Sequence, residues 1–400
     1  MKDEKPRGDA GSGIARLTLV LGAVMATGPL AVDMYLPALP TIASEYSVDA
    51  ARVQHTLSAY LLGLAMGQLL FGPLADRFGR KGPMLAGLAL YALASLGCAL
   101  SASIENFVLM RVAQALGGSS GMVVIRAIIR DRFDALQSAR VLSLMMLVMG
   151  GAPILAPLAG GWILVNSSWH WIFGFQCAFA VFCIASVAAL LPESHPHHRR
   201  SPSLGRALAG FAPVGRDARF FGPTLVFIFA FGAFFAYLAA APFVFIQHFG
   251  VDAANFGWYF GAGALGFISV SQLNRRLVMR GGPRRVLGWG VRLLSGAAAA
   301  LLIASVLDLG FLFVIAPIYV AVASLGLIAS NASAVAMAPF ADNAGGAASL
   351  LGASQSLVGV LASAAVGLVP AGGVRPMAVV VLMCAAVALA SYEFLVRRTR

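Results

Sequence analysis

Charged residues are scarce in this sequence of 400 residues, since only 11% of its side chains are Asp, Glu, Lys or Arg. A soluble protein of this length needs a larger polar exterior, even when its core is well buried. Hydrophobic residues make up 60% of the chain, and they recur in runs of about 20, long enough to cross the hydrocarbon core of a bilayer. The sequence therefore excludes an ordinary soluble domain and predicts a membrane protein with many spanning helices.

Cysteine is also rare, and its placement excludes a disulfide framework. All four cysteines fall within apolar runs, where they are typical of small buried side chains: Cys98, Cys177, Cys183 and Cys384. The spans offer neither an HExxH metal pair nor two carboxylates at facing depths, so we expect no metal site, no cofactor other than a transported proton, and no enzyme. Three histidines in a basic loop have no cysteine or acidic cluster beside them, and we expect a solvated loop there: His195, His197 and His198.

Hydropathy predicts an all-α protein with twelve membrane-spanning helices, at residues 14–39, 52–75, 82–101, 107–128, 138–163, 170–192, 221–246, 255–274, 286–307, 310–335, 344–369 and 376–396. Lys and Arg gather in the two tails and in alternate loops, whereas the opposite loops contain only Arg52 and Arg375. This asymmetry predicts that both termini are cytoplasmic. The net charge of +12 is thus a signal of topology, and no aromatic-interleaved basic patch suggests nucleic acid.

A polar connector near the midpoint divides the spans into two sets of six. The expected boundaries are an N-terminal tail, a six-helix bundle, a cytoplasmic linker, a second six-helix bundle and a short tail, at 1–13, 14–192, 193–219, 220–396 and 397–400. The loop GPLADRFGRKGP (72–83) has a degenerate copy, SQLNRRLVMRGG (271–282), in which Gly79 aligns with Val278. Parallel repeated halves are typical of secondary transporters, which bind substrate between the halves near the membrane midplane.

The loop GPLADRFGRKGP combines glycines and charges where the second span ends. We expect Gly79 to form the tight turn, and Arg80 and Lys81 to pair with Asp76 or with membrane headgroups. A charge cluster of this kind can hold two bundles in one conformation and release them in another. The residues with this expected gating role are Gly72, Asp76, Arg77, Gly79, Arg80 and Lys81.

With this loop and the segments given below, the sequence resembles the major facilitator superfamily, and more narrowly its Bcr/CflA branch of drug:proton antiporters with twelve helices. The resemblance covers essentially the whole chain and rests on DMYLPALP, TLSAYLLGLAMGQLLFGPLADRFGRK, APILAPLAGGWIL, SWHWIF and ASNASA. It implies the fold of that superfamily, a location in the bacterial inner membrane, and export of bicyclomycin- or chloramphenicol-type antibiotics in exchange for protons. It does not specify a single substrate.

The fifth span carries the pattern that the family associates with antiporters. Glycines here let neighbouring helices approach closely, and prolines remove backbone donors and bend the helix. The residues are Gly150, Gly151, Pro153, Pro157, Gly160 and Gly161. In the eleventh span, Gly359, Ser363 and Gly367 recur every four residues, and we expect them to serve helix packing.

Two charges fall inside the first half of the membrane region, Asp33 and Arg111, at similar depths from the outer side. Burial disfavours an ionised carboxylate, whereas a nearby arginine favours it. Asp33 is compatible with three roles: a proton carrier, a static ion pair with Arg111, or a residue at the membrane interface. The resemblance implies proton handling for Arg111 in the segment RVAQALGG, which departs from the family at Ala115, where glycine is usual. Arg292 is expected to be structural.

The remaining polar and aromatic residues of the spans suggest the lining of a substrate cavity. Such a cavity suits amphipathic molecules, because it is apolar with few hydrogen-bonding groups. The candidates are Tyr35, Tyr60, Gln68, Gln114, Phe227, Phe231, Phe234, Tyr319 and Asn331. The sequence thus predicts a proton-coupled exporter of drug-like molecules whose partners are substrate, protons and the bilayer, acting as a monomer. The alternative is a proton-coupled transporter of a small metabolite such as a sugar or amino acid, since direction depends on coupling and not on fold.

Overall fold

The computed structural model describes residues 8–133, 135–194, 214–215, 217–369 and 373–397, and these residues are helical with short connections. The first half contains α1 (Gly8–Asp33), η1 (Leu36–Ala38), α2 (Leu39–Glu45), α3 (Ala50–Phe78), α4 (Lys81–Ala99), α5 (Ile104–Arg132), α6 (Ala135–Asn166) and α7 (His170–Leu190). The second half contains α10 (Ala218–Pro242), η3 (Phe243–His248), α11 (Ala253–Gly281), α12 (Pro283–Val306), α13 (Phe311–Met337), η4 (Ala338–Asn343), α14 (Ala344–Leu368), α15 (Arg375–Ser391) and η5 (Tyr392–Val396).

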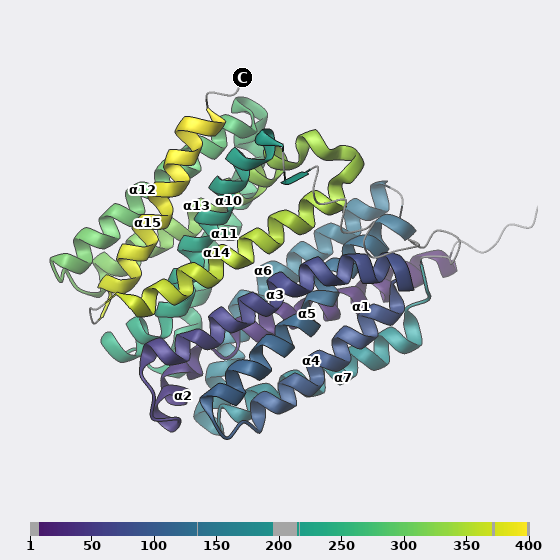
Figure 1. Ribbon diagram of the computed structural model, residues 1–400, viewed down its shortest axis with the longest axis horizontal. Helices are drawn as coiled ribbons and strands as arrows, with labels where there is room; N and C mark the ends of the chain where they lie inside the picture. Colours follow the sequence, from purple (N-terminus) through teal and green to yellow (C-terminus); the bar gives the residue numbers. More distant parts are fainter. Residues whose placement is uncertain (1–7, 134, 195–213, 216, 370–372, 398–400) are drawn as a thin grey trace, which may run out of the picture.

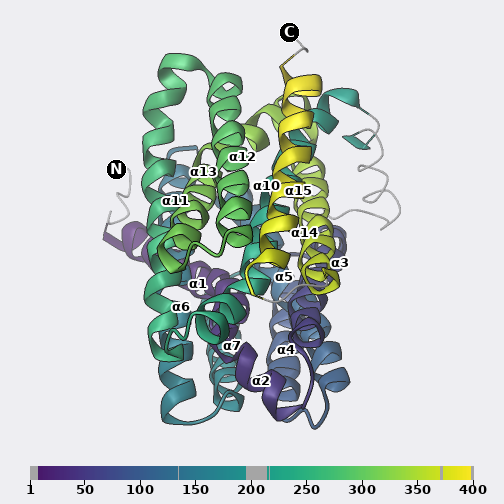
Figure 2. The same cartoon turned by 90° about the vertical axis from the view of Figure 1, so that its left-hand side faces the viewer.

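The long helices form two bundles of six, one from each half of the chain (Figure 1). In Figure 2 the green and yellow helices of the second half lie above the purple and blue helices of the first. Eleven of the described helices are long and apolar enough to cross a membrane. The twelfth long helix, α11, has 29 residues, but its glycines and polar side chains make its most apolar stretch less apolar than those of the other eleven. The predicted all-α fold with two six-helix bundles is confirmed. Most of the predicted linker, including His195, His197 and His198, lies outside the described residues.

The turns that follow α3 and α11 correct the repeat alignment. Gly79 ends α3 with φ 92°, and Gly282 ends α11 with φ 73°. Both angles lie in the left-handed region that only glycine adopts readily. The structure therefore matches Gly79 with Gly282, about one helical turn beyond Val278. The sequence alignment was wrong here because it matched basic residues, whereas the turn needs glycine.

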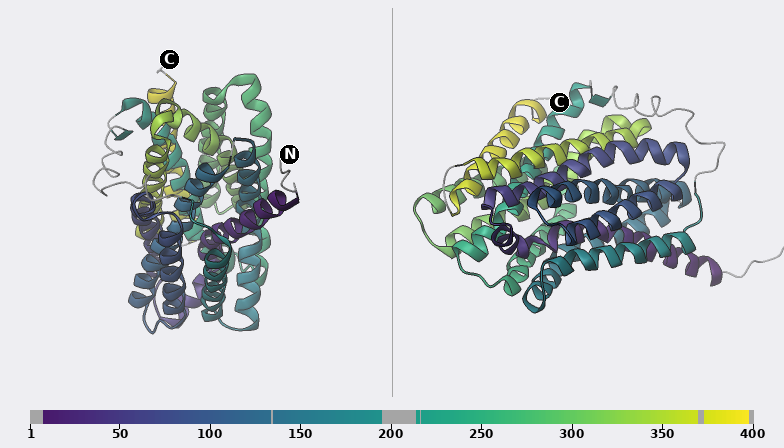
Figure 3. Two further views of the ribbon diagram at one scale, coloured as in Figure 1. Left: turned by 90° about the vertical axis from the view of Figure 1, so that its right-hand side faces the viewer. Right: turned by 60° about the horizontal axis from the view of Figure 1, so that its bottom comes forward.

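The bundles meet mainly along two helix pairs, α3 with α14 and α6 with α11. The blue α3 runs beside the yellow-green α14 in Figure 1 and in the right view of Figure 3. A Cβ on Gly359 of α14 would lie 2.6 Å from Phe235 of its own bundle and 3.0 Å from Leu61 of α3, and a Cβ on Gly367 would lie 2.9 Å from Ala51 of α3. Ser363, between these glycines, shares a 2.7 Å hydrogen bond with Ser58 of α3. The predicted packing role of this stripe is confirmed, and its partner is the opposite bundle.

The first span is not one continuous helix, contrary to the prediction of a helix over 14–39. The α-helix ends at Asp33, and a 3-10 turn follows at Leu36–Ala38 before α2 begins. Pro37 has no N–H for the carbonyl of residue 33, and Pro40 similarly interrupts the next turn. This break places the end of a helix, with its unpaired carbonyl groups, inside the protein.

Candidate functional site

Asp33 lies at the end of α1, at the break, and only 7% of its surface is exposed. Among the described residues, none donates a hydrogen bond to its carboxylate or forms an ion pair with it within 4 Å. Tyr60 of α3 and Tyr237 of α10 lie within electrostatic range of it. The burial contradicts a place at the membrane interface, because protein covers the side chain.

Arg111 of α5 is completely buried, and its guanidinium caps the end of α1. Its Nη1 donates to the carbonyl oxygen of Ala31 at 3.0 Å and to Oε1 of Gln114 at 2.5 Å. The charge also lies 4.1 Å and 4.4 Å from the ring centroids of Tyr35 and Tyr60. A cation at a helix C-terminus interacts favourably with the partial negative charge there, and aromatic faces add to this stabilisation.

The structure separates two roles that the sequence left open for this pair of charges. Arg111 binds the backbone two residues before Asp33, and no direct ion pair joins the two side chains. A static Asp33–Arg111 pair is therefore absent from this conformation. Nε and Nη2 of Arg111 are buried with no hydrogen-bond partner. Arg111 thus has unpaired donors and Asp33 an unpaired carboxylate, so each group can bind a further partner, such as a water molecule or, for Asp33, a proton.

A polar network holds Arg111 in place. Gln114 donates from Nε2 to Ser95 and to Gln176, both at 2.8 Å. Gln176 of α7 then donates to the carbonyl oxygen of Leu30 at 2.9 Å. Sequence reasoning found Gln114 but missed Ser95 and Gln176. The available signal was the amide of Gln176 in an otherwise apolar span, since a polar group buried there needs hydrogen-bond partners.

The other candidate lining residues of the first bundle lie close to this network or to the seam between the bundles. The Tyr35 hydroxyl shares a 3.3 Å hydrogen bond with Thr56, whereas the buried Tyr60 hydroxyl has no partner. Gln68 reaches across the seam to Ser356 of α14 at 3.4 Å. Substrate contact by any of these residues stays a prediction.

The candidates of the second bundle are engaged mainly within that bundle. Tyr319 donates to the carbonyl oxygen of Tyr259 at 2.9 Å, and Asn331 donates to Asn274 at 2.7 Å. Both bonds join α13 to α11. The three phenylalanines of α10 form a chain of ring contacts, with centroid distances of 4.8 Å and 6.4 Å: Phe227, Phe231 and Phe234.

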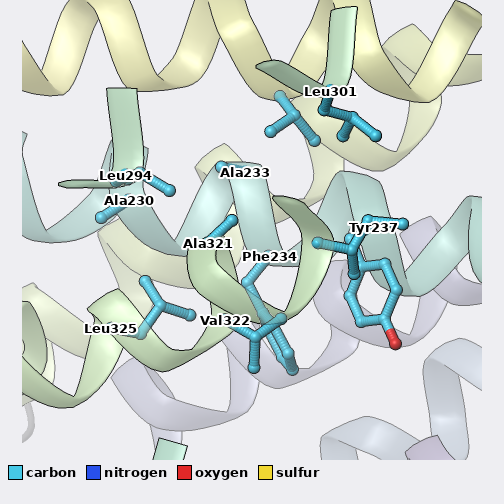
Figure 4. Close-up of a pocket in the computed structure, with 11 residues that line it drawn as sticks. Ala230, Ala233, Phe234, Tyr237, Leu294, Leu301, Ala321, Val322 and Leu325 are labelled. Atoms are coloured by element: carbon cyan, nitrogen blue, oxygen red, sulfur yellow. The ribbon is translucent and has the colours of Figure 1, made fainter. Parts of the chain in front are cut away.

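A small apolar cavity lies beside this aromatic chain (Figure 4). Its volume is about 20 Å³, enough for a single water molecule but far below the 300 Å³ or more of a typical ligand pocket. It is lined by Ala230, Ala233, Phe234, Tyr237, Leu294, Leu301, Ile318, Ala321, Val322, Leu325 and Val381. This cavity cannot hold a drug-sized molecule in the conformation described.

The glycine- and proline-rich pattern of α6 reaches the break in α1 through Gly160. A Cβ on Gly160 would collide with the carbonyl oxygen of Met34, the residue after Asp33. A Cβ on Gly161 would lie 2.7 Å from the carbonyl oxygen of Ala253, on the opposite bundle, and one on Gly150 3.3 Å from Ile268 of α11. One on Gly151 meets nothing within 4 Å. Pro153 and Pro157 lie inside α6. The pattern therefore packs α6 against both the break and α11.

The loop after α3 is tied to its own bundle. Arg80 is almost fully buried and pairs with Asp76 at 2.6 Å and with Asp131 of α5 at 2.9 Å. The backbone amides of Arg80 and Lys81 donate to the Glu193 carboxylate, which follows α7. The expected pairing of Asp76 with Arg80 is confirmed.

The other members of the loop motif have fewer polar contacts. Lys81 donates to the carbonyl oxygen of Ala188 at 2.7 Å. Arg77 is exposed beside the ring of Phe78, and Gly72 is only half-buried. Gating by the loop stays a prediction.

Comparison with known proteins places this geometry in a family. Residues 20–363 match the model of the Major Facilitator Superfamily. The chain is 33% identical to a Haemophilus influenzae protein named bicyclomycin resistance protein homolog, over 95% of this chain and 96% of that one. It is 30% identical to a Pseudomonas aeruginosa protein named chloramphenicol resistance protein, over 82% and 76% of the two chains. The fold is similar to that of the xylose transporter XylE from E. coli, in a partially occluded inward open conformation, with a TM-score of 0.75, 13% identity, and coverage of 97% and 98%. With its two six-helix bundles and its match over most of the sequence, the chain belongs to the Major Facilitator Superfamily of membrane transporters.

Proposed function

We propose that this transporter is a proton-coupled antiporter that exports amphipathic, drug-like molecules by alternating access. The observation that carries the proposal is Asp33, a buried carboxylate at a helix break that has no hydrogen-bond donor among the described residues. Such a group can bind either a proton or a hydrogen-bond donor of a substrate. If a proton and a substrate cannot bind Asp33 at the same time, the binding of one releases the other, as antiport requires.

Arg111 supports this role by fixing the site electrostatically. Its charge is anchored to the end of α1 by the Ala31 carbonyl oxygen and does not depend on the state of Asp33. When Asp33 is ionised, the opposite charges lie in the same region of the bundle, and when Asp33 is protonated the positive charge stands alone. The difference between these two states is large in a low-dielectric interior, so protonation can bias the conformation.

The substrate class follows from the surroundings of the site. Aromatic and aliphatic side chains dominate the interface of α10 with the break, and few groups there form hydrogen bonds. This composition suits molecules with an apolar body and one or two polar groups. The names of the two relatives, which refer to bicyclomycin and chloramphenicol resistance, support antibiotics of these types.

Transport would use the two glycine-rich seams, α3 with α14 and α6 with α11, as surfaces on which the bundles rock. We further propose that both termini face the cytoplasm of a bacterium and that the protein lies in the inner membrane, because Lys and Arg gather on that side. A monomer is sufficient for this mechanism.

Inverted membrane vesicles test the proposal. With an imposed proton gradient, acid inside, addition of chloramphenicol or bicyclomycin should release protons from vesicles containing the wild-type protein. Asp33→Asn should abolish this release while the amount of inserted protein stays the same, because the amide cannot carry a proton. Full proton release by Asp33→Asn would contradict the proton role. Substrate moving in the same direction as protons would contradict antiport.

A further inference from the structure

A second buried polar group near Asp33 comes from the opposite bundle. Tyr237 of α10 is 5% exposed, and its hydroxyl has no hydrogen-bond partner. Its ring is held firmly, stacked on Phe260 at a centroid distance of 6.1 Å and an interplanar angle of 8°. A buried hydroxyl without a partner is uncommon in proteins, because hydration is lost with nothing in return. We therefore expect another conformation of the protein to supply a hydrogen-bond partner for the Tyr237 hydroxyl.

The placement of Tyr237 indicates which partner this is. Its helix α10 contacts both η1, directly after the break, and α3. In Figure 4 the hydroxyl points away from the other labelled side chains, on the side where the pale purple ribbons of the N-terminal helices run. Asp33 lies within electrostatic range of the hydroxyl. An unpaired donor of one bundle and an unpaired acceptor of the other thus lie within electrostatic range, and no hydrogen bond joins them in this conformation.

We propose that Tyr237 is a positioning residue for Asp33: its hydroxyl donates a hydrogen bond to the ionised carboxylate, directly or through one water, as the bundles close around the break. Hydrogen bonds to a charged acceptor are about twice as strong as those to a neutral one. Protonation of Asp33 therefore weakens this bond. The chemical event on α1 is in this way transmitted to α10, and the two bundles separate more easily there.

The other ionisable groups around the break do not provide this link. Arg111 on α5, Tyr60 on α3 and Tyr35 before η1 all belong to the same bundle as Asp33. Among the residues whose side chains the structure describes, α6 and α7, which also pack against α1, face the break with uncharged groups, Gly160 and Gln176. Within the part of the chain that the structure describes, Tyr237 is the tyrosine of the second bundle that lies in electrostatic range of Asp33, and its neighbour Tyr319 already donates to the Tyr259 carbonyl oxygen. The inference rests on the proposed function only in taking Asp33 as the group that binds the proton.

A titration without substrate tests the link separately from drug transport. In reconstituted protein, the infrared band of the protonated Asp33 carboxyl group is identified as the one that Asp33→Asn removes, and its intensity is followed against pH. Tyr237→Phe removes only the hydroxyl and should move the midpoint of this titration to higher pH by about half to one unit, since the ionised form loses a donor. Tyr392→Phe is the matched control, because that hydroxyl donates to the Arg284 carbonyl oxygen elsewhere in the same bundle. Its midpoint should equal that of the wild type.

The proposal is overturned if Tyr237→Phe leaves the midpoint unchanged, or if no band depends on Asp33. An unchanged midpoint bears only on the link between Tyr237 and Asp33 and leaves the proposed drug export intact, whereas the absence of an Asp33 band also contradicts the proposed proton role of Asp33. A shifted midpoint in a protein that exports no drug would support the link and contradict the proposed function. A second measurement excludes a purely structural effect. Spin labels on Phe78→Cys of α3 and Met279→Cys of α11, both exposed, report the distance between the bundles. Tyr237→Phe should alter the pH dependence of this distance but should have no further effect in the Asp33→Asn background.

Discussion

The two bundles share an architecture but differ in what they bury. The first bundle buries one cation, Arg111. A hydrogen-bond network of Gln114, Gln176 and Ser95 holds it, and this network ends on carbonyl groups of α1. The core of the second is aliphatic and aromatic with a small apolar cavity, and its main buried polar pair is Asn274 with Asn331. Charge in a membrane interior is expensive and is kept where it functions. Under the proposed function, the first bundle carries the chemistry, and the second responds through its packing and through the Tyr237 hydroxyl.

The sharpest test of this comparison removes one arginine from each bundle. Arg111→Met should lower proton-coupled transport in inverted vesicles by about 13- to 160-fold, since hydrogen bonds to charged groups contribute about 1.5–3 kcal/mol. Arg292→Met is the matched variant of the second bundle. Arg292 pairs with Glu393 at 2.5 Å, but nearly half of its side chain is exposed. Such a pair contributes little, so transport should change less than about twofold. Equal losses in both variants would show that the bundles do not divide their roles in this way.

A methyl group tests the packing of α6 on the break. Gly160→Ala directs its Cβ at the carbonyl oxygen of Met34, and the strain should lower the free energy of unfolding by about 1–3 kcal/mol. Gly151→Ala adds the same methyl group to the same helix where nothing lies within 4 Å, and its stability should equal or slightly exceed that of the wild type. Unfolding of the purified proteins in detergent by increasing denaturant compares the two. If Gly160→Ala were as stable as Gly151→Ala, the close approach to the break would be wrong.

The smallest effect concerns two buried amides, one in each bundle. Gln176→Leu and Asn274→Leu each remove interhelical hydrogen bonds, and each should lower stability in the same unfolding assay by only about 0.6–1.7 kcal/mol. Their effects on transport should differ, because only Gln176 supports Arg111. Gln176→Leu should reduce the rate of proton-coupled transport about threefold or more, in line with a loss near 0.6 kcal/mol. Asn274→Leu should leave that rate close to the wild-type value. A larger transport defect in Asn274→Leu would reverse the comparison.

Much of the candidate site was visible in the sequence as individual residues but not as a geometry. Asp33 and Arg111 stood out because a charge in an apolar run is conspicuous, and the loop pair Asp76 and Arg80 followed from spacing within one turn. The prediction of a continuous first helix was wrong, although Pro37 lacks the N–H that a continuous helix would need at this position. Gln176 and Tyr237 were missed because an amide or a tyrosine in a span has many ordinary roles. The functional role of such a residue becomes visible only from the side chains around it in the fold.

The sequence by itself determined the class of this protein: the spans, the two halves and the membership of its family, because these depend on local hydropathy and on motifs within short segments. Tertiary structure alone decided that Arg111 binds the Ala31 carbonyl oxygen instead of the Asp33 carboxylate, that small residues of α14 face α3, and that Tyr237 of the other bundle lies in electrostatic range of Asp33. The physical reason is that hydropathy records whether a side chain is buried, whereas its partner depends on the rotation, tilt and breaks of helices distant in the chain.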